Sequence, residues 1–302
     1  MHDFSREEII MKKASEIKAE ALASLEGKDM RKTTLLFWVL IFGVAIVMMI
    51  AMAILILIPF LGILAAIVIY FALLFMIMTL IYKYNAACLD ISHGKSRTLK
   101  DILDFSGNDS LLRSFLGLFI PGMVVFIMGC VTMVPFYFIF TKLIMPAIPP
   151  ALLILVGFIF SVILLIPAFI YYYACSLSPF LAHDYPQKGI VECVKKSIAT
   201  MKGNKLRLMW LDLTFIGWYL LIFLAGLILS YVARYGIFAM LLGMAIYIVI
   251  YIAIMCHVFP YWTTARAHFY NHLMDNKNIV QDILDDPEDP DEEDLDRILN
   301  NK

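Results

Sequence analysis

The polar and apolar residues of this chain separate into long apolar runs and short charged segments. The first run extends from Thr33 to Tyr82 without a Lys, Arg, Asp or Glu. As one helix it would measure roughly 75 Å, more than twice the ~30 Å hydrocarbon core of a bilayer, so it must fold back, and Pro59 with Gly62 marks the turn. Because the runs are apolar on every face and do not alternate, they predict transmembrane helices and not barrel strands. Six such helices are predicted, at residues 35–57, 60–82, 114–140, 151–178, 208–232 and 235–259.

Shorter amphipathic segments precede each predicted pair of spans. Two of them begin with the spacing of a capping box: Ser5 with Glu8, and Thr98 with Asp101. Each is followed by a glycine that can adopt a left-handed turn: Gly27, Gly107 and Gly203. The apolar stripe of the first segment consists of Ile10, Ala14, Ile17, Ala21 and Leu25, and that of the second of Leu99, Ile102 and Leu103.

The third segment, residues 187–203, has the clearest two-faced pattern. Its apolar face is predicted to carry Ile190, Val191, Val194, Ile198 and Met201. Its polar face carries Glu192, Lys195, Lys196 and Lys202. Gly203 and Asn204 then allow the chain to turn from lying along the membrane to crossing it.

These patterns predict an all-α, polytopic membrane protein with six transmembrane helices as three hairpins, each preceded by a cytoplasmic amphipathic helix. Residues 1–34 would form the N-terminal amphipathic helix, and residues 35–274 the transmembrane domain with interfacial helices near residues 98–106 and 187–203. We interpret the three units as diverged copies of one repeat. The alternative is that any six-span protein with cytoplasmic loops of this length shows amphipathic loop helices.

Composition supports the membrane assignment, because 62% of the residues are hydrophobic and only 16% are charged. Of the 24 Lys and Arg residues, only Lys142 and Arg234 fall in loops between the two helices of a hairpin. The positive-inside rule therefore places both termini in the cytoplasm. The five cysteines lie in or beside the spans without CxxC spacing, which predicts free thiols.

The net charge of −1 hides a basic membrane domain and an acidic C-terminal tail, residues 275–302. The tail is predicted to be disordered, since ten acidic residues and two prolines fall between Asp282 and Asp296. Basic groups near the membrane would attract anionic headgroups, so membrane lipids are expected partners. The tail either only solubilises the protein or docks a basic cytoplasmic protein partner.

Asp212 is the one acidic residue well inside a predicted span. A buried carboxylate is costly and suggests a binding or proton-handling role, but near the start of its span it could have a structural role at headgroup level. A cytoplasmic-side cavity is predicted from polar groups that begin or end a span: Tyr82, Tyr84, Asn85, Asp212, Tyr261 and Arg266. The candidate headgroup contacts are Lys195, Lys196, Lys202, Lys205 and Arg207.

Other motifs are assigned structural roles. Gly217 and Trp218 are interpreted as a contact where another helix approaches closely. Three prolines within spans either line a pathway or only kink their helices: Pro121, Pro135 and Pro167.

His268 and His272 have the i, i+4 spacing of metal ligands, but the sequence around them lacks a full ligand set. No metal or other cofactor is therefore predicted. The loops lack a nucleophile with its base, a phosphate-binding glycine loop and a dinucleotide fingerprint. An enzyme is not expected, and neither is a nucleic-acid partner.

The segment SIATMKGNKLRLMWLDLTFIGWYLL, followed by PYWTTARAHFYNHL, resembles the DUF975 family of bacterial, mostly Gram-positive, membrane proteins. The matching positions are Ser197, Met201, Gly203, Asn204, Phe215, Ile216, Gly217, Trp218, Pro260, Tyr261, Phe269 and Tyr270. Thr214 stands where the family tends to have Ser. The resemblance implies a multi-pass protein of the bacterial cytoplasmic membrane and no established activity.

Two functions follow from these patterns. In the first, the bundle binds or moves a lipid or amphiphilic peptide, with its basic segments gathering anionic headgroups. In the second, it is a non-transporting scaffold or accessory subunit that binds partner proteins. A continuous polar path through the bundle would favour the first, and tight apolar packing throughout would favour the second.

Overall fold

The computed structural model describes residues 12–28, 30–55, 61–105, 111–139 and 150–285. Every regular element in these ranges is a helix, which confirms the all-α prediction. The chain divides into two compact units, one made of Met1–Asp104 with Arg207–Lys302 and the other of Phe105–Leu206. The second unit thus falls within the predicted transmembrane domain of residues 35–274.

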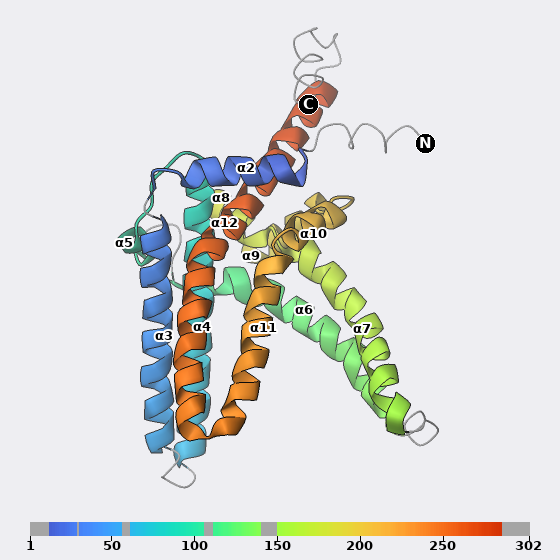
Figure 1. Cartoon of the computed structure of the whole chain (residues 1–302). Helices are drawn as coiled ribbons and strands as arrows, with labels where there is room; N and C mark the ends of the chain where they lie inside the picture. Colours follow the sequence, from blue (N-terminus) through green and yellow to red (C-terminus); the bar gives the residue numbers. More distant parts are fainter. Residues whose placement is uncertain (1–11, 29, 56–60, 106–110, 140–149, 286–302) are drawn as a thin grey trace. The chain divides into compact units, whose positions relative to one another are not determined.

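The first unit is arranged around one long helix, α12 (Ile237–Asp285), which contacts α2, α3, α4 and α11. The remaining helices of this unit are α2 (Ala14–Leu25), α3 (Met30–Leu55), α4 (Leu61–Ser92), α5 (Leu99–Ile102), α11 (Ile216–Val232) and η3 (Ala233–Tyr235). A further helix, α10 (Lys205–Leu213), begins at the boundary between the units and leads into α11. Helix α2 runs across the ends of α3 and α4, whereas α12 runs alongside them and continues past α2 (Figure 1).

An aromatic core joins α3, α4 and α12 at the end where α2 lies. The fully buried ring of Tyr84 packs between Phe37 and Phe259, with centroids 4.9 and 4.7 Å away. The Tyr84 hydroxyl is 2.7 Å from Oγ1 of Thr34, which itself donates to the carbonyl of Met30. Both buried hydroxyls therefore have partners, as apolar surroundings require.

The apolar stripe of α2 packs on this core as its spacing predicts. Ile17 is 2% exposed and Ala21 is fully buried, and α2 contacts both α4 and α12. Gly27 follows with a φ of +71°. The predicted capping residues Ser5 and Glu8 lie outside the described residues.

The segment after α4 is held in place by ion pairs with a buried carboxylate at the end of that helix. Asp90 accepts hydrogen bonds from Lys95 Nζ at 2.7 Å and Arg97 Nε at 2.9 Å. The following helix α5 is only one turn long, and both the amide and the hydroxyl of Thr98 donate to Asp101. These two hydrogen bonds lower the pKa of Asp101 below its ordinary value. Gly107 lies outside the described residues.

The second unit consists of α6 (Leu111–Ile139), α7 (Pro150–Cys175), α8 (Ser178–Asp184) and α9 (Ile190–Thr200). Arg113 at the start of α6 donates to three backbone carbonyls at the end of α8 and beyond it: Ala182 at 2.8 Å, Tyr185 at 3.0 Å and Lys188 at 3.0 Å. Ser197 of α9 donates to the carbonyl of Ala174 at the end of α7, at 2.8 Å. Side chains thus satisfy carbonyls that helix ends leave without partners.

Helix α9 buries its apolar stripe against its own unit, where it contacts α6, α7 and α8. Ile190, Val194 and Met201 are buried as predicted, but Val191 is 52% exposed because it is turned away from the buried face of this helix. Gly203 has a φ of +88°, which confirms the predicted left-handed turn. All five cysteines are free thiols, and burial raises the pKa of Cys193 in α9.

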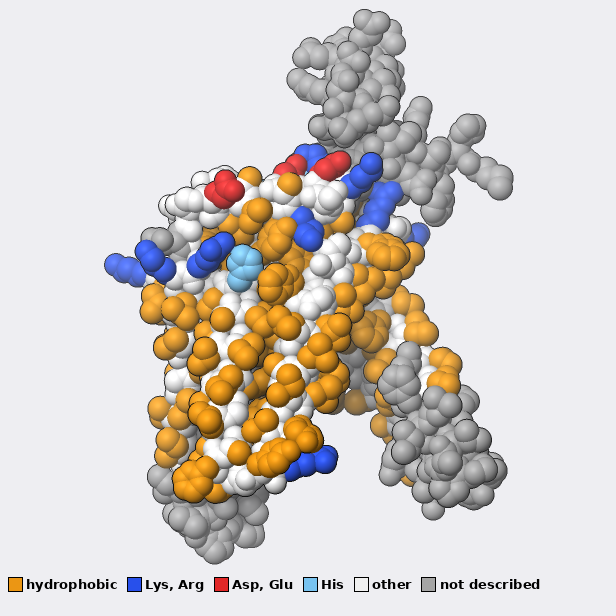
Figure 2. All heavy atoms as spheres, viewed as in Figure 1, with side chains coloured by type: hydrophobic (Ala, Val, Ile, Leu, Met, Phe, Trp, Pro, Cys, Tyr) orange, Lys and Arg blue, Asp and Glu red, His pale blue; other side chains and the backbone are white. Residues whose placement is uncertain are grey.

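Among the described residues, five helices are long and apolar enough to cross a membrane, or six if a bent pair counts as one span. The five segments are Met30–Met48, Ile67–Ser92, Leu111–Val131, Leu165–Asp184 and Ile237–Asp275. In the first unit, hydrophobic side chains cover α3, α11 and α12, whereas charged side chains gather at the α2 end (Figure 2). Such apolar surfaces suit a lipid environment.

Several helices differ from the sequence prediction: α3 begins earlier, at Met30, and α4 continues beyond the predicted end at Tyr82 to Ser92. The span predicted at residues 208–232 is bent by 50° between α10 and α11, where the Thr214 hydroxyl bonds to the Leu211 carbonyl and competes with regular helix pairing. Helix α12 continues to Asp285, through the first part of the predicted disordered tail. Residues 275–285 contain no Pro or Gly, and the first helix-breaking residue of the tail is Pro287.

The turn after α9 gives a stability prediction. A side chain at the positive φ of Gly203 is strained, so Gly203→Ala should lower the free energy of unfolding by about 1 kcal/mol. Gly122→Ala in α6 is the matched control, because nothing lies within 4 Å of its added Cβ and Ala favours helix. Circular dichroism melts in detergent would measure both, and equal melting temperatures would contradict the expectation.

Candidate functional site

Asp212 of α10 lies in a polar cluster with two residues of α12, and we call Asp212, Trp262 and Arg266 the carboxylate cluster. Its carboxylate accepts hydrogen bonds from Trp262 Nε1 at 2.7 Å and Arg266 at 3.1 Å. Trp262 and Arg266 are four residues apart and therefore share one helix face. The guanidinium carbon of Arg266 also lies 4.6 Å from the centroid of the Trp262 ring.

The carboxylate cluster is mostly shielded from solvent. The side chains of Arg266 and Asp212 are 11% and 15% exposed. Each Asp212 oxygen has a donor from the protein, so the charge that looked costly in the sequence is paired. This geometry favours the structural role for Asp212, since a free carboxylate is not needed to explain its position.

Tyr261, next to the cluster in sequence, belongs to an aromatic pair that meets α2. Its ring packs edge-on against the buried Phe215 with centroids 5.0 Å apart. The Lys18 ammonium lies 5.0 Å from the Phe215 centroid and 5.8 Å from that of Tyr261. This cation–π contact helps hold α2 on the unit.

The other predicted cavity residues lie in or beside the core. Tyr82 and Tyr84 are fully buried, and Asn85 is half-buried. The structure therefore brings Asp212 and Arg266 together and places Tyr82 and Tyr84 within the packed interior.

The predicted headgroup residues differ in their freedom to contact a ligand. Lys195 and Lys202 are exposed, whereas Lys196 is half-buried with its ammonium 3.8 Å from the centroid of the Tyr185 ring. Lys205 and Arg207 are half-buried. The exposed side of α9 therefore offers Lys195, and Lys202 extends it just beyond the helix end.

The family-like positions are divided between core and surface. Phe215, Pro260, Phe269 and Tyr270 are buried, as is Asn204. Gly217 does not make the predicted close helix contact: among the described residues, no other helix lies within 4 Å of a Cβ added at this position. The ring of Trp218 packs edge-on against that of His257 with centroids 5.8 Å apart.

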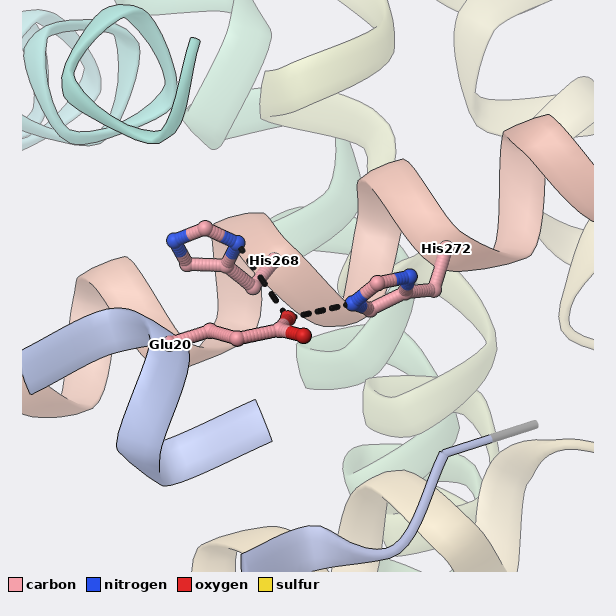
Figure 3. A group of neighbouring side chains, drawn as sticks. All are labelled: Glu20, His268 and His272. Atoms are coloured by element: carbon pink, nitrogen blue, oxygen red, sulfur yellow. Dashed lines mark hydrogen bonds and ion pairs between the residues drawn. The ribbon is translucent and has the colours of Figure 1, made fainter. Parts of the chain in front are cut away.

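One cluster of possible metal ligands was not predicted from the sequence, because its members are far apart along the chain. Glu20 of α2 points between His268 and His272 of α12 (Figure 3). The spacing of the two histidines was visible in the sequence, but nothing local indicated that α2 would supply a carboxylate. Burial raises the pKa of Glu20, but hydrogen bonds from Lys12 and His272 outweigh it and leave the pKa below its ordinary value.

The carboxylate cluster predicts a large effect of removing Asp212. Asp212→Ala should destabilise the protein by about 3 kcal/mol, because the Arg266 guanidinium would lose its carboxylate partner in a shielded site. Asp275→Asn, at an exposed position of α12, is the control and should have no measurable effect. Denaturant titration of both variants would test this, and equal stabilities would show that the pair contributes nothing.

Comparison with known proteins gives a family and no function. No curated protein and no solved structure matches the chain. The model of a family described as a protein of unknown function, DUF975, matches residues 11–277. This match covers both units and nearly the whole sequence, so the chain belongs to the DUF975 family.

Proposed function

We propose that this protein is a non-enzymatic, multi-pass protein of the bacterial cytoplasmic membrane that binds anionic lipids at its cytoplasmic face. The observation that carries the proposal is the orientation of α9. Ile190 and Val194 of its apolar stripe are packed on protein, and its exposed side presents Lys195 together with Val191 and Glu192.

The proposed topology has six spans in three hairpins with both termini in the cytoplasm. It is supported by contacts between helices that are consecutive along the chain: α3 with α4, α6 with α7, and α11 with α12. The bent pair of α10 and α11 supplies the fifth span. The exposed Arg234 then lies on the outer side, opposite to the basic segments.

The exposed side of α9 suits a headgroup better than an acyl chain. Val191 and Lys195 are one helical turn apart and both exposed, and Lys202 follows. A basic residue close to an anionic membrane surface contributes about 1 kcal/mol to binding. Two exposed lysines, Lys195 and Lys202, can therefore produce a measurable preference for anionic lipid.

Binding is favoured over transport by the distribution of buried polar groups. In the described part of the first unit, such side chains lie near the α2 end: Thr33, Thr34, Thr79, Lys83, Asp90, Thr263, Thr264 and Arg266. The buried polar groups therefore do not form a continuous path along α3, α4 and α12. The scaffold function remains the alternative, and the acidic residues beyond Asp285 that would serve it lie outside the described residues.

Lipid analysis of the full chain in native nanodiscs would test the proposal. The wild type should enrich one anionic lipid class over the bulk membrane. Changing Lys195 and Lys202 to Gln together should lower this enrichment roughly tenfold or more, given about 1 kcal/mol for each charge. Arg234→Gln is the control, because it removes an exposed charge at the opposite end of the spans.

The contrary result is equally specific. Bulk-like lipid around the wild type, or equal enrichment in all three proteins, would exclude the α9 lipid site. The scaffold function would then be tested by pull-down with the full chain, comparing the wild-type tail with one whose acidic residues are changed to Asn and Gln.

A further inference from the structure

We propose that Glu20, His268 and His272 form a binding site for one divalent transition-metal ion of the zinc type. The proposal concerns a different set of residues from α9 and does not rest on lipid binding. The bound ion would cross-link α2 to the part of α12 that extends beyond the aromatic core.

The three side chains converge on one small volume. Oε2 of Glu20 lies 2.6 Å from Nε2 of His272 and 3.8 Å from Nδ1 of His268. One ligand atom from each residue lies within 4.8 Å of the other two. In a tetrahedral zinc site, bonds of ~2.0–2.1 Å put neighbouring ligand atoms about 3.3 Å apart. The observed separations bracket this value, so small side-chain rotations would complete the geometry.

The neighbouring groups orient these ligands as the outer partners of a metal site do. Ser24 Oγ lies 2.8 Å from Nε2 of His268, which leaves Nδ1 of that ring facing Glu20. Lys12 donates to Oε1 of Glu20, whereas Oε2 faces the two histidines. A metal bound through Oε2 would therefore leave both outer hydrogen bonds in place.

The backbone beneath the site is fixed independently of any ion. On α2, the buried Ile17 and Ala21 hold the helix on the core while Glu20 remains half-exposed. On α12, the neighbouring residues Phe269, Tyr270 and Leu273 are buried. Asn271 also donates to Ser92 Oγ at 2.9 Å. The ligands are thus held on two packed helices, as a binding site requires.

The ligand set selects the class of ion. Two imidazole nitrogens and one carboxylate oxygen suit Zn²⁺, Co²⁺ or Fe²⁺, and fit poorly with Ca²⁺ or Mg²⁺, which prefer oxygen ligands. Three protein ligands leave at least one coordination position for water. The competing explanation is a latch without metal, in which His272 and Glu20 are joined by their hydrogen bond alone.

The test uses Co²⁺ and Zn²⁺ with the purified full-length protein in detergent. The wild type should bind one Co²⁺ per chain with visible absorption bands of a low-coordinate site, and Zn²⁺ should displace it. Glu20→Gln, which keeps the shape of the side chain, and His272→Ala should each weaken Co²⁺ binding at least tenfold. His257→Gln, at an exposed histidine of the same helix, should leave it unchanged.

A fourth variant distinguishes a metal site with oriented ligands from metal binding by two neighbouring histidines alone. Ser24→Ala removes only the outer partner of His268 and should weaken Co²⁺ binding roughly tenfold. Failure of the wild type to bind Co²⁺ saturably would overturn the proposal and leave the hydrogen-bonded latch. Equal binding by wild type and Glu20→Gln would also overturn it, because the carboxylate would then not be a ligand.

Discussion

The packing of α12 against α2, α3 and α4 is the constraint on which the first unit depends. Tyr84 lies at the centre, with Phe37 and Phe259 on its ring and Thr34 on its hydroxyl. Farther along α12, the carboxylate cluster and the Glu20 group are formed by residues that follow this core. The geometry of both groups therefore depends on the aromatic packing. A substitution that leaves a cavity at Tyr84 would disturb them although Tyr84 does not contact them.

The two units satisfy polar groups in different ways. In the first, charged side chains meet each other, as Asp212 meets Arg266 and Asp90 meets Lys95. In the second, Arg113 and Ser197 donate to backbone carbonyls near helix ends. Both solutions lie near the ends of apolar helices, where a chain leaving hydrocarbon must first find partners for its backbone and charges.

The sequence predicted the helical class, the stripe of α2 and the turn at Gly203, because each depends on local spacing or backbone conformation. It predicted that Val191 is buried, but this residue lies at the edge of the apolar face of α9 and is exposed. It could not join Asp212 to Trp262, or Glu20 to His268, because those contacts arise from tertiary packing. Asp212 stood out in the sequence as a carboxylate inside a span, but its partners Trp262 and Arg266 could not be predicted from the spacing along the chain.

The length of α12 has a mechanical consequence. Its 49 residues extend for roughly 74 Å, more than twice the thickness of a hydrocarbon core. A helix adapts to a thicker or thinner bilayer by changing its tilt, and a tilt of about 10° would displace one end of a straight helix of this length by roughly 13 Å relative to the other. Because α2 is packed on α12, a change in the tilt of α12 would also move α2.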